Sequence, residues 1–173
     1  MHIVCTIPIN KFKYLINKVP ELLPVQLQII LINEGSFTRT LKYLTSQIIK
    51  VKTSQKEQNI KTNTIRKIRC VWLETSIYTK LLFARSLWYL IYKNRQLQNI
   101  KSQLPIGQSF IEHQIDIHKK IHEIHYGYCE ELERTLKSKE PLWGRKYTLY
   151  YKDKSYLTIQ EIFSQKITIF FSL

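Results

Sequence analysis

Glycine and alanine are scarce in this chain, which has four glycines and a single alanine, Ala84, among 173 residues. Loops that cradle phosphates or present a nucleophile are built on glycines at fixed spacings. The sequence contains no G-x-G-x-x-G, P-loop or nucleophile-elbow pattern. The composition therefore argues against a dinucleotide-binding enzyme, a P-loop nucleotidase and an α/β-hydrolase.

Cysteines and long apolar runs are few as well. The three cysteines, Cys5, Cys70 and Cys129, are odd in number and show no metal-binding or redox spacing, so we interpret them as free thiols in a reducing compartment. No apolar run approaches the roughly 18 residues of a membrane-spanning helix. Residues 1–20 lack the cleavage pattern of a signal peptide and the Ser/Arg richness of a transit peptide. We expect no membrane span and a protein that works where it is made.

Acidic residues are outnumbered, with 13 Asp and Glu against 27 Lys and Arg and a net charge of +14. Such a charge attracts anionic partners, whether nucleic acid, a membrane surface or a small acid. The codon bias of an AT-rich genome also explains it, together with the abundance of Ile, Lys, Asn and Tyr. The stretch R-K-Y-T-L-Y-Y-K at residues 145–152 is able to stack bases, but it also fits a half-exposed strand. We favour codon bias and expect no nucleic-acid partner.

The apolar pattern predicts one α+β domain over residues 1–173. Alternation typical of strands occurs in residues 46–55, in both halves of residues 65–90, and in residues 115–125, 141–152 and 156–163. Two short helices, one after Pro24 and one after the N-cap candidate Ser36, predict an αα-hairpin that covers one face of a sheet. Because strands and helices do not alternate, we predict a six-stranded antiparallel sheet with flanking helices. Residues 1–19 give no clear pattern.

Four charged residues interrupt strand faces that are otherwise apolar: Arg69, Arg85, Lys119 and Glu161. A charge on such a face is costly to bury unless something pairs with it. The faces are therefore exposed, or the charges form an ion-pair network, or they line a pocket for an anion. In a pocket, three cations and one carboxylate suit a buried dianion with one hydroxyl for Glu161 to accept from.

Three histidines invite a metal hypothesis. His118, His122 and His125 are spaced i, i+4, i+7, and on a helix they would form one face of possible ligands. The isoleucines of this stretch recur at period two, which favours a strand, and on a regular strand His125 points away from the other two. No nearby Cys or Asp completes the set, so we expect no metal.

Six motifs in order resemble those of the chorismate lyase family, over residues 20–165: L-I-N-E-G-S-F-T-R, I-R-C-V-W-L-E, L-L-F-A-R-S, L-P-I-G-Q-S-F-I, P-L-W-G-R-K-Y and I-Q-E-I-F. The chain is most similar to the cyanobacterial branch and to its plastid-encoded relative in red algae, which implies a plastid location. The resemblance implies helical flaps over a buried site. It also implies conversion of chorismate to 4-hydroxybenzoate and pyruvate, with neither metal nor organic cofactor, for quinone biosynthesis.

The resemblance also assigns roles to residues. It implies that Arg69 holds a carboxylate of chorismate and that Glu161 meets the ring hydroxyl, as the two catalytic residues. Lys119, or Lys120 if the alignment shifts by one, stands where the family has an arginine. Lysine offers a point charge rather than a bidentate fork, which bears on carboxylate orientation and rate. The other expected substrate-binding residues are Arg85, Ile106, Gly107 and Phe37.

Two other functions stay open on the sequence. The same fold resembles the effector-binding domain of some bacterial transcription regulators, which indicates a non-catalytic module for small acids, although no helix-turn-helix is evident. The charge would suit a basic RNA-associated protein, whose binding would depend steeply on salt. We expect a monomer.

Overall fold

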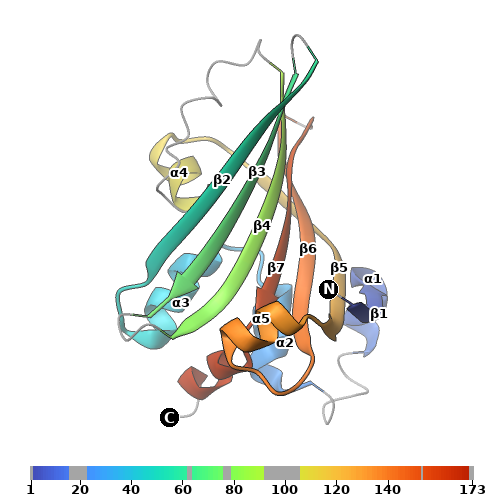
Figure 1. Cartoon of the computed structure of the whole chain (residues 1–173), viewed down its shortest axis with the longest axis vertical. Coiled ribbons are helices and arrows are strands. Elements are labelled where there is room, and N and C mark those ends of the chain that lie inside the picture. Colours follow the sequence, from blue (N-terminus) through green and yellow to red (C-terminus); the bar gives the residue numbers. More distant parts are fainter. Residues whose placement is uncertain are drawn as a thin grey trace.

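The computed structural model describes residues 2–15, 23–61, 64–75, 79–91, 106–152 and 154–171. A single twisted antiparallel sheet organises this part of the chain (Figure 1). Its strands are β1 (His2–Pro8), β2 (Lys50–Lys61), β3 (Thr64–Glu74), β4 (Lys80–Ile91), β5 (His118–Tyr128), β6 (Leu142–Tyr151) and β7 (Lys154–Phe163). The spatial order is β1-β5-β6-β7-β4-β3-β2.

The sheet has seven strands, so the prediction of six was wrong by one. The additional strand, β1, lies at the edge and pairs antiparallel with β5. Nearly all of its side chains are exposed, on both faces of the strand. A strand that buries neither face shows no apolar–polar alternation, which is why its sequence gave no signal.

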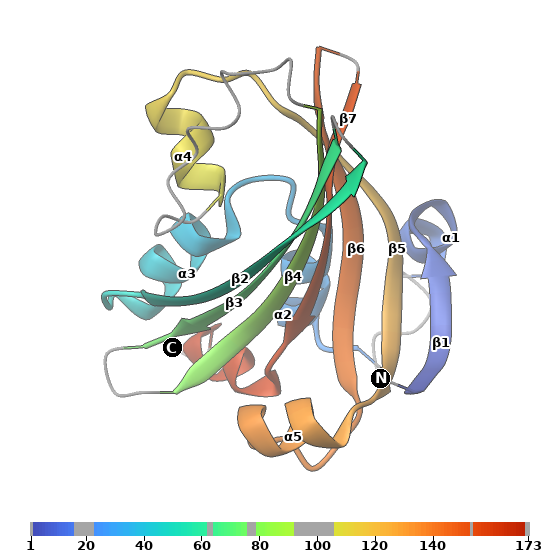
Figure 2. The same ribbon diagram turned by 45° about the horizontal axis from the view of Figure 1, so that its top comes forward.

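Helices lie on both faces of the sheet (Figures 1 and 2). The face that we call the inner face carries α2 (Val25–Ile32), α3 (Phe37–Thr45) and α4 (Ile106–Glu112), whereas α5 (Glu130–Leu136) lies against the outer face. The remaining helical elements are α1 (Ile9–Leu15) and the 3₁₀ helix η2 (Gln165–Phe171). The predicted αα-hairpin is present, with Pro24 and Ser36 as the N-cap residues of its helices. Residues 92–105, which precede α4, lie outside the described residues.

Two apolar clusters hold these layers together. The larger packs α2 and α3 against the inner face through residues such as Leu31, Leu41 and Leu82. The smaller packs Leu132 and Leu136 of α5 against the outer face. Burial of apolar area of this kind is the main stabilising term for the fold. Within the described residues, no helix is long and apolar enough to cross a membrane.

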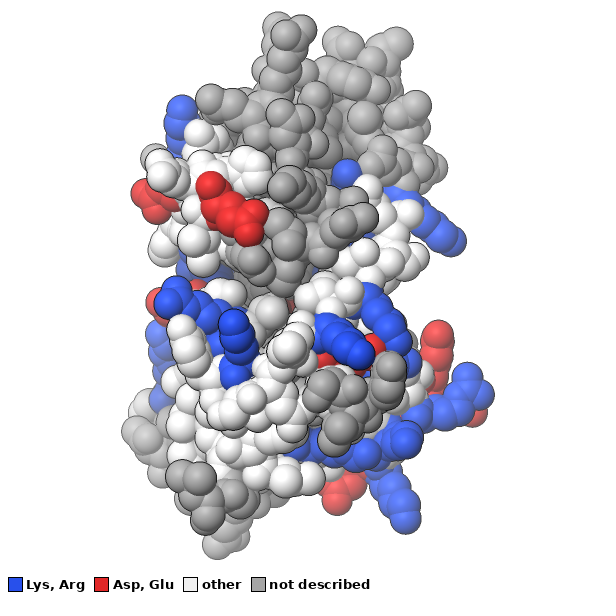
Figure 3. Space-filling model, turned by 90° about the vertical axis from the view of Figure 1, so that its left-hand side faces the viewer, with Lys and Arg blue, Asp and Glu red and all other residues white. Residues whose placement is uncertain are grey.

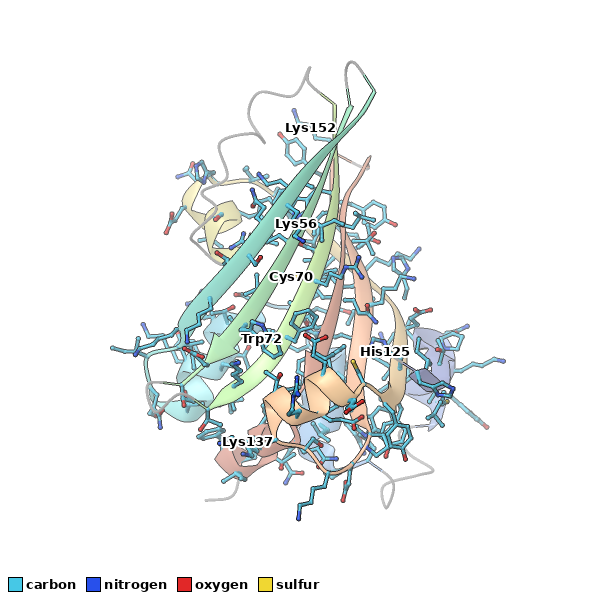
Figure 4. All side chains as sticks on the ribbon, in the orientation of Figure 1. Lys56, Cys70, Trp72, His125, Lys137 and Lys152 are labelled. Carbon is cyan, nitrogen blue, oxygen red and sulfur yellow. The ribbon has the colours of Figure 1, made fainter. Side chains whose placement is uncertain are left out.

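A β-bulge in β5 changes which side chains share a face. The register with β6 shifts between Ile121 and Glu123, so the extra residue reverses the alternation beyond it. His122 bonds Thr148 on the outer face through Nε2 and Oγ1, 2.8 Å apart. His125 also lies on the outer face, over Gly144 (Figure 4), and not on the opposite side as predicted. Among the described residues, no group of His, Cys, Asp and Glu is arranged to hold a metal ion.

Candidate functional site

A cavity of about 370 Å³ lies between the inner face and the helices that cover it. Its floor is apolar and comes from four central strands: Val71, Leu73, Leu82, Ala84, Leu149 and Ile159. Its rim is formed by the loop between α2 and α3, by α4, and by the segment that leads from α4 into β5. The volume and the apolar lining are typical of a site for one small molecule.

The carboxylate of Glu161 lies at the cavity and is held by two neighbours on β6. Arg145 donates from Nε to Oε2 of Glu161 at 2.7 Å, and the Tyr147 hydroxyl donates to Oε1 at 2.9 Å. Burial alone would raise the pKa of Glu161, but Arg145 and Lys119 hold it below its usual value. Burial and the adjacent Glu161 raise the pKa of Tyr147, so its hydroxyl stays a donor. Glu161 is thus an ionised acceptor in an apolar site.

Arg145 also links the end of α2 to the sheet by hydrogen bonds. Its side chain is 0% exposed, and Nη1 donates to the carbonyl oxygens of Ile30, Leu31 and Asn33 at 2.8, 3.3 and 2.7 Å. The last carbonyls of a helix have no partners within the helix, and cations are favourable at that end. One guanidinium therefore satisfies the end of α2 and fixes Glu161 at the same time.

Lys119 lies at the rim of the cavity and ties down the loop that follows α2. Its Nζ donates to the carbonyl oxygens of Asn33 and Gly35 at 3.2 and 3.3 Å and lies 4.3 Å from the centre of the Tyr147 ring. Burial lowers the pKa of Lys119 to about 8, and repulsion from Arg145 adds to the effect. Lys120 is exposed on the opposite face, so of the two lysines it is Lys119 that lines the cavity.

Arg69 is buried on the inner face, 1% exposed, on the strand that supplies Val71 and Leu73 to the cavity floor. The adjacent strand contributes Ser86, whose hydroxyl donates to the carbonyl oxygen of Arg69 at 3.3 Å and accepts from the Trp88 indole at 2.9 Å. Burial lowers the pKa of the Arg69 guanidinium. Arg69 itself is not among the described residues that line the cavity.

Arg85 does not belong to this site. Although it is one strand away from Arg69, its side chain is exposed on the outer face, between Phe83 and Leu87. The inner face of β4 presents Ala84 and Ser86 to the cavity instead. Alternation correctly grouped Arg85 with two apolar neighbours, but that group faces away from the cavity.

Phe37, Ile106 and Gly107, the remaining predicted residues, all line the cavity. Gly107 comes close to the α2–α3 loop, because a Cβ at this position would lie 3.2 Å from Oγ of Ser36. The loop and the start of α4 therefore meet over the cavity. A side chain at Gly107 would therefore require the Ser36 side chain to shift slightly.

Charged side chains surround the entrance. Glu34 and Asp116 line the rim and are exposed, and Glu34 acts to raise the pKa of Lys119. Figure 3 views the molecule from the side of α3 and α4, where acidic and basic side chains border a hollowed surface. The sequence interpretation missed both carboxylates, because they lie in loops, where alternation gives no signal.

Arg145 and Tyr147 were missed as well, although a signal for them exists. On β6 they share the inner face with Leu149. A charge on an apolar strand face is the same anomaly that pointed to Glu161. The interleaved basic and aromatic residues of this strand were instead interpreted as a half-exposed strand. For that reason Arg145 was not recognised as a charge on an apolar face.

Comparison with known proteins identifies the family. A family model described as chorismate pyruvate-lyase Rv2949c-like matches residues 31–171, which include every cavity residue described above. The chain belongs to this family. The family resemblance found in the sequence is therefore confirmed.

Curated relatives of this chain include proteins of red algae. The ycf21 protein of Antithamnion sp. is 38% identical over 153 residues, which are 88% of this chain and 86% of the relative. The ycf21 protein of Porphyra purpurea is 41% identical over 147 residues, 82% of either chain. These ycf21 proteins are plastid-encoded, and the predicted plastid location is confirmed.

Solved structures show the same fold at very low sequence identity. PhnF from Mycobacterium smegmatis superimposes with a TM-score of 0.55 and 8% identity, over 78% of this chain and 66% of that chain. The effector domain of PhnF alone gives a TM-score of 0.53 and 8% identity, with 91% of that domain covered. The likeness is therefore to the effector domain, and it concerns the fold only.

Proposed function

We propose that the protein is a lyase that converts chorismate to 4-hydroxybenzoate and pyruvate. The observation that carries the proposal is the cavity itself, where an ionised Glu161, held by Arg145 and Tyr147, and the cation of Lys119 line one apolar space. Apolar walls suit a six-membered ring, and the polar groups suit its hydroxyl and carboxylate substituents. Membership of the chorismate pyruvate-lyase Rv2949c-like family supports the same substrate.

Two cations would neutralise the two carboxylates of chorismate. We propose that Lys119, at the rim of the cavity, pairs with one of them and that Arg69, buried on the inner face, pairs with the other. Glu161 would then accept a hydrogen bond from the ring hydroxyl. The negative charge of Glu161 also disfavours binding of a substrate carboxylate where the ring hydroxyl lies, which selects one orientation of the substrate.

The reaction breaks the ether bond between the ring and the enolpyruvyl group. The ring carbon that bears the hydroxyl loses its hydrogen as a proton, the electrons complete the aromatic ring, and the enolpyruvate that leaves takes up a proton to become pyruvate. Negative charge grows on the departing oxygen, and fixed cations stabilise it more in the transition state than in the substrate. In this proposal Lys119 and Arg69 supply that stabilisation, and Glu161 keeps the ring in position.

The experiment is incubation of the purified protein with chorismate, with 4-hydroxybenzoate measured by chromatography and pyruvate by a coupled assay. Equal amounts of both products, formed above the rate of spontaneous decay, are expected. A folded protein that forms neither product would overturn the proposal.

A second candidate is a non-catalytic module that binds a small acid. The fold shared with the effector domain of PhnF favours it, as does a lysine, Lys119, where the family resemblance expects an arginine. Such a module would bind chorismate or 4-hydroxybenzoate without turnover. If Lys119→Arg then produced turnover, the cavity would be that of an enzyme weakened at one residue; continued binding without turnover would favour the module.

A further inference from the structure

Glu161 has four neighbours on the inner face of the sheet. Along β7 they are Ile159 and Phe163, two residues before it and two residues after it. Across the strands they are Arg145 on β6 and Ala84 on β4, each directly opposite Glu161. Ile159 and Ala84 line the cavity, and Ala84 has by far the smallest side chain of the four. The side of Glu161 that faces β4 is therefore its most open side within the sheet.

The opposite side of the carboxylate is occupied. Arg145 and Tyr147, both on β6, donate to the two oxygens of Glu161 at 2.7 and 2.9 Å. The Cβ atoms of directly opposite residues in antiparallel strands are about 4.5–5.5 Å apart. The Cβ of Ala84 therefore lies near that of Glu161, and the alanine has no further atoms that extend toward the carboxylate. A ligand group has room to approach Glu161 over Ala84.

This open side continues along β4, which lies between β7 and β3 (Figure 1). The next residue on the inner face is Ser86, which is also small and lines the cavity. Larger apolar side chains border the two, because Val71 is directly opposite Ala84 and Ile159 is directly opposite Ser86. The chain contains a single alanine, and it lies here, beside Glu161. A ring lying over Ala84 and Ser86 would have one end at the carboxylate.

We propose that Ala84 determines the specificity of the cavity for a ring that carries a hydroxyl group, because its small side chain keeps open the approach by which that hydroxyl reaches Glu161. The inference rests on the proposed function, since it takes the ring of that reaction as the ligand. A side chain with two more carbon atoms would fill the approach without changing the charge or the apolar character of the floor. Recognition of the hydroxyl would then be lost while the rest of the cavity stays the same.

The experiment is calorimetric titration with 4-hydroxybenzoate and with benzoate, which differ only in the hydroxyl group. The wild type should bind 4-hydroxybenzoate at least about tenfold more tightly, because benzoate leaves the buried Glu161 without its ligand donor. The readout is the ratio of the two dissociation constants, because partial unfolding of a variant weakens both affinities equally. In Ala84→Val this ratio should fall to about one. Ala84→Ser adds a single atom, and its hydroxyl can itself donate to Glu161, so this variant should lower the ratio as well.

The matched control is Cys70→Val, which places a β-branched side chain on the outer face of β3, the strand next to Ala84. It should keep the ratio of the wild type. Three results would overturn the inference: the ratio of the wild type in both Ala84 variants, an equal loss in Cys70→Val, or a wild type that does not prefer 4-hydroxybenzoate.

The titration involves no turnover, so it separates this inference from the proposed reaction. A lowered ratio in Ala84→Val, in a protein that does not convert chorismate, would overturn the lyase and support the role of Ala84. An unchanged ratio in both Ala84 variants, in a protein whose wild type converts chorismate, would overturn the role of Ala84 and support the lyase.

Discussion

The binding of 4-hydroxybenzoate should weaken as the pH rises from about 7 to about 9, because Lys119 loses its proton in that interval. The pKa of Lys119 is lowered from 10.5 to about 8, first by burial and then by Arg145. The bound carboxylate would favour the charged form of Lys119, so protonated protein binds more tightly than deprotonated protein. Raising the pH therefore removes the form that binds.

The size of the effect follows from the pKa of about 8. About nine-tenths of Lys119 is protonated one pH unit below that value, and about one-tenth one unit above it. The apparent dissociation constant should therefore rise about tenfold between these two pH values. Although ligand binding weakens as the pH rises, the free energy of unfolding of the unliganded protein should increase. The unfolded chain holds the lysine proton up to its ordinary pKa, so stability rises with pH between about 8 and 10.5, by at most about 3 kcal/mol.

Calorimetric titration with 4-hydroxybenzoate at several pH values measures the first effect. Lys119→Arg keeps its charge throughout this pH range and should bind with nearly constant affinity. Any change of affinity with pH in this variant would come from titration of the ligand, so the variant is the control for that effect. Lys120→Arg, at the exposed neighbour on the outer face, should behave as the wild type. A constant affinity in the wild type, or the same loss in Lys119→Arg, would refute the role given to Lys119.

Three further substitutions test two residues of the inner face and one close contact on the outer face. Arg145→Met leaves Glu161 buried without its cation and leaves three carbonyls at the end of α2 without this donor. The free energy of unfolding, measured by urea denaturation, should therefore fall by about 3–5 kcal/mol. A loss near zero would contradict the pairing of Arg145 with Glu161. Glu161→Gln should destabilise less, because Arg145 keeps its carbonyl partners, yet it should impair turnover, and an unchanged rate would remove Glu161 from the mechanism. Gly144→Ala would place a Cβ against His125 and 2.5 Å from the carbonyl oxygen of Glu161, so stability should fall by about 1–3 kcal/mol; an unchanged midpoint of denaturation would show that the strands yield there.

Alternation of side chains located much of the site from the sequence. It grouped Lys119 and Glu161 with apolar neighbours, and in the structure both groups face the same cavity. It failed for Arg85 because alternation tells which residues share a face but not which face is covered. The cavity side of that strand carries Ala84 and Ser86, whose small side chains leave room for a ligand.

Features that depend on tertiary contacts could not be predicted from the alternation of side chains along the sequence. The bulge after Ile121 reverses the face of His125, and nothing in the local sequence marks it. β1 buries neither face, so it shows no period of two. The link from Arg145 to the end of α2 joins segments more than a hundred residues apart, and only the folded chain brings them together.

The most direct test of the account compares two arginines on neighbouring strands. Arg69 is buried on the inner face beside the cavity floor, and Arg85 is exposed on the outer face. In assays of chorismate turnover with folded proteins, Arg69→Met should lose 4-hydroxybenzoate formation, whereas Arg85→Met should match the wild type. Equal loss in both variants, or full activity in Arg69→Met, would contradict the claim that the inner-face cavity binds and converts chorismate.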